Sequence, residues 1–115
     1  MNVDHRALAR VAERRAHPRF AIQVQIELRQ DNNDTPIRLQ TSDLSQGGCY
    51  VEMMITLPVG THLNATFWLD DVPVRVRARI MTRHPQYGNG IAFLEFQGDG
   101  EQLLASYLDK HGSDM

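Results

Sequence analysis

The chain has 115 residues, enough for one domain with one hydrophobic core, and its 42% hydrophobic and 23% charged residues are ordinary for a soluble globular protein. Its formal net charge of −2 argues against binding of nucleic acid polymers through a general excess of positive charge. A single cysteine excludes an internal disulfide, and no apolar run approaches the roughly 20 residues of a membrane span. The charged start does not resemble a secretion signal. We therefore expect a cytoplasmic location without membrane insertion.

The first segment favours a helix followed by an arginine-rich linker. Residues 4–14 are good helix formers, and apolar residues recur at helical spacing at Ala7, Leu8, Val11 and Ala12. Pro18 pushes the residue before it toward extended geometry, so the helix has to end earlier. We therefore predict a helix and linker over residues 1–19, where ERRAHPRF concentrates three arginines on a bend.

Six stretches then alternate between apolar and polar residues, the pattern of strands with one buried face. We predict strands over residues 20–29, 37–42, 49–54, 63–69, 72–80 and 91–96. Asp70 and Asp71 form a candidate hairpin tip, and HPQYGNG (84–90) has the composition of a loop. Short half-buried strands with turns between them indicate a small antiparallel barrel or sandwich, and we favour the barrel because closure removes exposed edges.

A final amphipathic segment predicts a C-terminal helix over residues 99–110. Asp99 is a candidate N-cap with Gln102 three residues later, as in a capping box. Its apolar face consists of Leu103, Leu104, Tyr107 and Leu108. The prediction is thus a single domain over residues 1–115, all-β with terminal helices, whose barrel spans residues 20–97.

The stretch DLSQGG (43–48) separates the second and third predicted strands, and we interpret it as a turn. Asp43 and Ser45 place an acceptor and a hydroxyl on one rim. Gly47 and Gly48 permit positive φ and a close approach of backbone N–H groups to a ligand. If this rim meets the arginine linker in space, the pair forms a site for a polar anion.

Together the two stretches resemble the PilZ domain family. The family's RxxxR motif matches Arg15 and Arg19, and its DxSxxG motif matches Asp43, Ser45 and Gly48, in the same order and at similar separation. GNGIAFLEF (88–96) and EQLLASYL (101–108) are similar to the family's last barrel strand and closing helix, so the likeness covers nearly the whole chain. It implies a six-stranded antiparallel PilZ-type β-barrel with an N-terminal helical arm and a C-terminal helix. It also implies a bacterial receptor for the second messenger cyclic di-GMP.

The chemistry of that ligand suggests a role for each motif residue. An arginine fork can hydrogen-bond the O6 and N7 edge of guanine or clamp a phosphate. We therefore predict Arg15 and Arg19 at guanine edges and phosphates, Asp43 and Ser45 at polar atoms of guanine or ribose, and Gly48 in a shaping role.

The resemblance has three further implications. In the family, an arginine just before RxxxR goes with a stacked dimer of the nucleotide, so Arg14 implies two ligand molecules per domain. Ligand binding is expected to order the arm and to signal to a downstream protein that controls motility, biofilm or exopolysaccharide. No cofactor besides the ligand is implied.

Two rival interpretations remain open. The first is a nucleotide-independent PilZ-like adaptor, in which the arginines pair with nearby carboxylates and the DLSQGG residues stabilise only their own turn. The second is a barrel that binds single-stranded RNA through Arg75, Arg77, Arg79 and Trp68. A simpler interpretation of these three arginines is that they form a solvated strand face, with ion-pair partners such as Glu27 or Glu52.

Other polar residues suggest no further chemistry. Arg83 or His84, placed just beyond the predicted fifth strand, could reach the ligand rim, but no aromatic residue there would stack on a base. The five histidines and Cys49 lack the spacing of metal ligands. Without a nucleophile elbow, phosphate-binding loop or carboxylate pair, the sequence predicts neither a metal site nor an enzyme.

Overall fold

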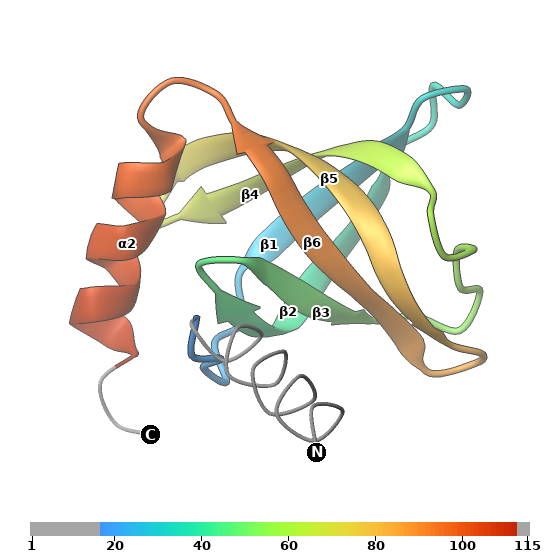
Figure 1. Cartoon of the computed structure of the whole chain (residues 1–115), viewed down its shortest axis with the longest axis horizontal. Coiled ribbons are helices and arrows are strands. Elements are labelled where there is room, and N and C mark those ends of the chain that lie inside the picture. Colours follow the sequence, from blue (N-terminus) through green and yellow to red (C-terminus); the bar gives the residue numbers. More distant parts are fainter. Residues whose placement is uncertain (1–16, 113–115) are drawn as a thin grey trace, which may run out of the picture.

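The structure, a computed structural model, describes residues 17–112. The predicted N-terminal helix, with Arg14 and Arg15, lies outside the described residues. The elements are β1 (Gln25–Gln30), β2 (Ile37–Ser45), β3 (Gly48–Glu52), β4 (His62–Leu69), β5 (Val72–His84), β6 (Gly88–Phe96) and α2 (Gly100–His111). All neighbouring strands pair antiparallel in the order β1-β2-β3-β6-β5-β4, and the pairing of β4 with β1 closes the barrel (Figure 1). The predicted six-stranded barrel is confirmed.

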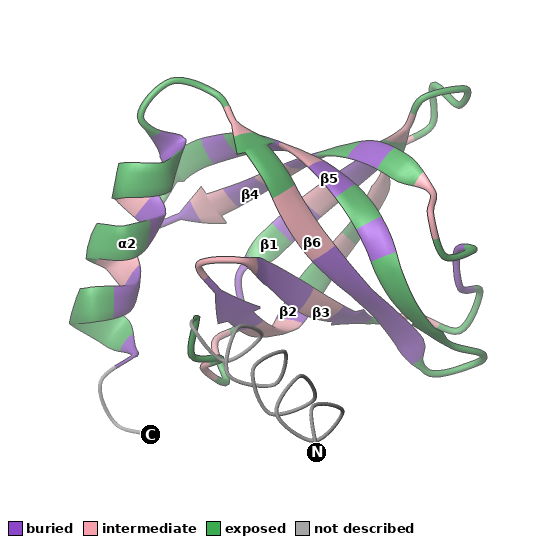
Figure 2. Cartoon of the chain, in the orientation of Figure 1, coloured by how far each residue is buried: buried purple, intermediate pink, exposed green. Residues whose placement is uncertain are grey.

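The barrel is filled by one face of each strand. Alternation along β4 and β5 buries the residues predicted to face inward, and the buried positions recur along these strands in Figure 2. Phe67 is fully buried and stacks on Phe93, with ring centroids 5.2 Å apart. Val72 is the exception, because it lies next to the hairpin tip and is 44% exposed. That tip is confirmed: Asp70 and Asp71 have φ values of 49° and 74°, which suits a tight hairpin turn.

Helix α2 packs against β4 and β5 through Leu104 and Leu108, which are buried. Its start is close to the barrel, since a Cβ on Gly100 would lie 2.9 Å from Cγ1 of Val74. The helix begins and ends one residue later than predicted, at Gly100 and His111. Asp99 is the N-cap residue, but its side chain makes no capping hydrogen bond, so the predicted capping box is wrong.

The first predicted strand is wrong in its first half, because β1 begins at Gln25 and not at Phe20. The Ile22 N–H donates to the Phe20 carbonyl at 2.8 Å, a local turn that interrupts the strand geometry. The Thr41 hydroxyl then donates to the Ile22 carbonyl (2.8 Å) and accepts the Val24 N–H (3.0 Å). The Thr41 hydroxyl thus bonds two backbone groups, at Ile22 and Val24, that lie ahead of the first strand.

Two predicted loops are shorter than expected. Asp43 to Ser45 belong to β2, and the turn to β3 consists only of residues 46–47. The predicted loop 84–90 shrinks to residues 85–87, because β5 extends to His84 and β6 begins at Gly88. This position of the β6 ladder requires a glycine, because a Cβ on Gly88 would overlap the carbonyl oxygen of Val51 on β3.

Candidate functional site

The arm that carries Arg19 is attached to β2 by an isolated bridge. The Phe20 N–H donates to the Leu44 carbonyl (3.0 Å), and the Leu44 N–H donates to the Phe20 carbonyl (2.9 Å). Leu44 is fully buried, and Phe20 packs against the core beside it. Because successive side chains on extended backbone point to opposite sides, Arg19 is directed outward, and its side chain is 68% exposed.

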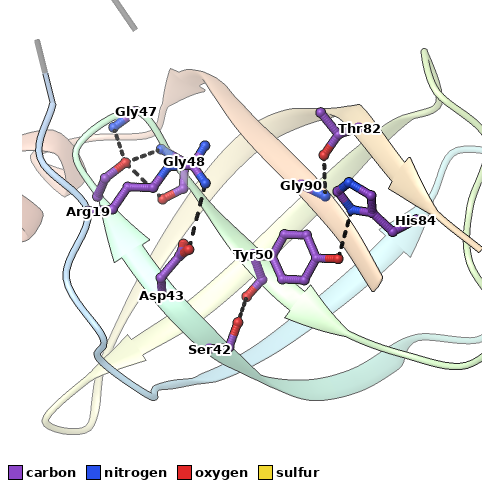
Figure 3. A network of polar contacts seen from close by, with 10 residues as sticks. Arg19, Ser42, Asp43, Gly47, Gly48, Tyr50, Thr82, His84 and Gly90 are labelled. Atoms are coloured by element: carbon purple, nitrogen blue, oxygen red, sulfur yellow. Dashed lines mark hydrogen bonds and ion pairs between the residues drawn. The ribbon is translucent and has the colours of Figure 1, made fainter. Parts of the chain in front are cut away.

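Arg19 and Asp43 lie together on the outside of the barrel (Figure 3). Their closest charged atoms, Nη1 and Oδ2, are 3.7 Å apart, which is longer than a charge-assisted hydrogen bond. The other carboxylate oxygen of Asp43, Oδ1, is buried and accepts no hydrogen bond from the described residues. Buried polar atoms normally have a hydrogen-bond partner, and no donor among residues 17–112 supplies one to this oxygen. The prediction that the arginine linker and the Asp43 rim meet in space is thereby confirmed for Arg19.

Ser45 is occupied by its own turn. Its hydroxyl accepts the N–H groups of Gly47 (3.2 Å) and Gly48 (3.1 Å) and donates to the Gly48 carbonyl (3.2 Å). A hydroxyl offers one donor and two acceptor positions, so none is left for a ligand. The residue is buried and lines the cleft described below, and it supports the site by holding the turn.

Gly48 stands at a position with no room for a side chain. A Cβ at this position would overlap the carbonyl oxygen of Ile91 on the paired strand β6. Gly47 is less constrained, because a Cβ there would lie 3.1 Å from Cδ2 of His17, a side-chain atom of the arm. The DxSxxG motif therefore builds a close β2–β3 turn over which the arm folds.

A cleft of about 380 Å³ opens beside this turn, a size within the range of small-molecule sites. Its lining includes His17 and Arg19 of the arm, the β2–β3 turn, and Met81 and Thr82 of β5. Gly48, Gly90 and Ala92 contribute to its lining, so much of the cleft has little or no side chain above the sheet. A flat ligand in this cleft can therefore approach the backbone closely while it contacts Arg19.

The basic stripe on β5 is mostly a charged outer face. Arg77 is held by Asp31 through two hydrogen bonds of 2.6 and 2.7 Å, and this contact lowers the pKa of Asp31 and raises that of Arg77. The partners suggested from sequence, Glu27 and Glu52, are not the ones used; Glu27 pairs with Arg29 and Arg38. Arg75 and Arg79 are exposed, and Trp68 is half-buried.

Arg83 and His84 lie within β5, not beyond it. The Arg83 guanidinium donates to the hydroxyl (2.8 Å) and carbonyl (3.3 Å) of Thr56, which holds it on the loop after β3. His84 contacts Tyr50 on β3, a residue that the sequence reasoning missed. The available signal was the alternation of residues 49–52, which places Tyr50 on the outer face.

Cys49 points inward, and burial raises the pKa of its thiol far above the ordinary value.

The family model for the PilZ domain matches residues 13–110. The chain belongs to the PilZ domain family. Its fold resembles that of the Bacillus subtilis inhibitor of motility (MotI/DgrA), with a TM-score of 0.72 and 16% identity over 84% of this chain and 50% of that one, so it spans half of that protein's length. It also resembles the PilZ domain of CeSA from a cellulose-synthesizing bacterium, with a TM-score of 0.55 and 23% identity over 80% of this chain and 92% of that one. At these identities the likeness concerns the fold. A search of curated proteins found no match.

PilZ domains are binding and adaptor domains. Within residues 17–112, no three histidine, cysteine or acidic side chains are grouped as metal ligands would be. The one helix described there is too short and too polar to cross a membrane.

Proposed function

We propose that this PilZ domain binds cyclic di-GMP in the cleft beside Arg19 and Asp43 and acts as a receiver for that signal. The observation that supports the proposal is Oδ1 of Asp43, which accepts no hydrogen bond within residues 17–112 and belongs to a carboxylate beside the mostly exposed Arg19 guanidinium. Both groups are left with hydrogen-bonding capacity, and each matches a group that guanine presents.

Guanine offers N–H donors on one edge and the O6 and N7 acceptors on another. The Asp43 carboxylate complements the donors, and the Arg19 guanidinium complements the acceptors or a phosphate. Arg15 joins Arg19 in this role by its place in the RxxxR motif, and Arg14 adds a cation for a second, stacked nucleotide. Ser45 and Gly48 hold the turn beneath the ligand.

Ligand binding would reach a partner protein through the arm. The bridge at Phe20 attaches the chain to the barrel, so a ligand held by Arg19 and the arginines before it changes the surface on the N-terminal side of that bridge. The two similar structures come from an inhibitor of motility and from a PilZ domain of a cellulose-synthesizing bacterium. We propose an output of the same kinds, motility, biofilm or exopolysaccharide control, in the bacterial cytoplasm.

The main alternative is a nucleotide-independent adaptor, and the state of Ser45 favours it. All three hydrogen-bonding positions of its hydroxyl serve the turn, so the serine of the DxSxxG motif is explained without a ligand. The unsatisfied Asp43 oxygen is not explained in this way, and that difference makes the receptor the stronger proposal.

Titration calorimetry on the full chain tests the receptor. We expect saturable heat with cyclic di-GMP and none with GTP, and a loss of affinity of about tenfold or more in Arg19→Ala, the range for a charged hydrogen bond. Arg79→Ala is the matched control, because Arg79 is an exposed β5 arginine without an ion pair among the described residues. Absence of heat in the wild type favours the adaptor. A stoichiometry of two supports the role of Arg14, and a stoichiometry of one removes it.

A further inference from the structure

Tyr50 lies directly beside Asp43 on the outside of the barrel. The two residues are register partners across β2 and β3, so their side chains leave the sheet on the same face. The neighbours of Tyr50 along β3, Cys49 and Val51, are buried and point inward. Figure 3 shows Tyr50 between Asp43 and His84.

The ring of Tyr50 is fixed in place from below and at its tip. A Cβ on Gly88 would lie 2.8 Å from Cε2 and 2.9 Å from the hydroxyl oxygen of Tyr50, so the ring rests over this glycine. The hydroxyl is 3.0 Å from Nδ1 of His84, and the two ring centroids are 5.8 Å apart with planes tilted by 45°. The Cε2 edge and the tip of the ring thus lie close to the Gly88 backbone, while the residue as a whole is only half-buried.

Tyr50 separates two open regions of the surface. On one side, its register partner on β6, Gly90, lines the cleft that also contains Arg19. On the other side, Tyr50 itself lines a hollow of about 520 Å³ together with Glu52, Met53 and Tyr87. A ligand with two flat bases that starts at the Asp43 carboxylate would meet this ring when it extends along the glycine-lined surface.

We propose that Tyr50 is a ligand-contacting residue that stacks on a guanine base of the cyclic dinucleotide, and that His84 is a positioning residue that holds the Tyr50 ring. The inference rests on the proposed function and adds an aromatic contact to it. Stacking suits a guanine because an aromatic side chain offers a planar apolar face, and the close approach is possible because Gly88 and Gly90 carry no side chain. The hydrogen bond to His84 limits the rotation of the ring before the ligand arrives.

The affinity of the full chain for cyclic di-GMP is measured in four single variants and one double variant. We expect Tyr50→Ala to lose about tenfold or more in affinity, the range for a lost base–aromatic contact. Tyr50→Phe keeps the ring and is expected within about threefold of the wild type, since it loses only a neutral hydrogen bond. Tyr87→Ala is the control, because Tyr87 is a 74% exposed tyrosine of the same hollow, and it is expected to bind like the wild type.

His84→Ala tests the positioning role. It is expected to weaken binding by about threefold in the wild-type background and to have no further effect when combined with Tyr50→Ala, because its action passes through the ring. A second readout does not depend on any variant: stacking shifts the ring proton resonances of Tyr50 upfield when cyclic di-GMP is added, which a purely structural tyrosine would not show.

The outcomes separate the two proposals. A wild type that fails to bind cyclic di-GMP ends the proposed function and this contact with it. A wild type that binds, with Tyr50→Ala equally tight or with Tyr87→Ala equally impaired, overturns the Tyr50 contact alone. If Tyr50→Ala does not fold, unchanged Tyr50 resonances in the ligand-bound wild type overturn it as well.

Discussion

Phe20 and Leu44 exchange two backbone hydrogen bonds of 3.0 and 2.9 Å, and this bridge between the arm and β2 positions Arg19 at the cleft. Arg19 precedes Phe20, and Asp43 precedes Leu44. Because the bridge directs Phe20 and Leu44 inward, the residues next to them face outward and meet, with Nη1 and Oδ2 3.7 Å apart. The site therefore depends on an apolar anchor that touches no ligand.

Phe20→Ala is expected to weaken cyclic di-GMP binding although Phe20 lies outside the cleft. Its half-buried ring helps to hold the bridge, and its loss lets Arg19 move away from Asp43. Calorimetry should show an affinity loss approaching that of Arg19→Ala, with a fall of about 1–3 kcal/mol in the free energy of unfolding. Ile22→Ala is the control, since it removes another half-buried side chain of the same segment beyond the bridge. Equal affinity losses in both variants would contradict the anchoring role.

Gly48→Ala is expected to disrupt the barrel, whereas Gly47→Ala should be tolerated. The added methyl at Gly48 overlaps a backbone carbonyl of β6 that cannot move without separating two paired strands. Urea unfolding should show a loss of about 3 kcal/mol or more. At Gly47 the methyl meets only the side chain of His17, so a change below about 1 kcal/mol is expected. Similar stabilities of the two variants would refute this reading of the turn.

Ser45→Ala is expected to destabilise the turn by about 1–3 kcal/mol, because it leaves the N–H groups of Gly47 and Gly48 without their acceptor. Ser42→Ala, which removes a single hydroxyl hydrogen bond of 3.3 Å to the Tyr50 carbonyl, should cost less than about 1 kcal/mol. The comparison is made by chemical unfolding. A neutral Ser45→Ala that nevertheless abolishes ligand binding would instead show direct ligand contact by this hydroxyl.

The thiol of Cys49 is expected to be inert in the folded protein. It is buried, and burial with the nearby Asp43 carboxylate raises its pKa, so little thiolate forms near neutral pH. A colorimetric thiol reagent at about pH 8 should label the protein only after urea is added. Rapid stoichiometric labelling without urea would contradict the buried position of the Cys49 side chain.

The ion pair between Asp31 and Arg77 is expected to stabilise the fold above about pH 4 and to lose its effect in acid. The Arg77 hydrogen bonds lower the folded-state pKa of Asp31, so its contribution is present above the unfolded-state pKa of about 4 and disappears as the pH falls through the lower folded value. The Tm difference between wild type and Asp31→Asn should therefore be larger at pH 6 than at pH 3. A pH-independent difference for Asp31→Asn would rule out the ion pair as its cause.

The sequence by itself determined the barrel and its motifs. Apolar residues at every second position predicted which side chains of β4 and β5 fill the core, and acidic residues at Asp70 and Asp71 predicted the hairpin tip. These features depend on neighbours within a few residues, where steric preference and burial act locally. The two short motifs, in order, also sufficed to predict the family that the comparison then showed.

Tertiary structure alone decided how the motif residues are used. The bulge between Thr41 and Asp43 in the β2–β3 pairing is a non-local feature, and with it Asp43 leaves the sheet beside Tyr50 and near Arg19. The same packing brings His84 to Tyr50 across 34 residues of sequence. Strand register and close approach at glycines depend on partners far along the chain, and local alternation contains no information about them.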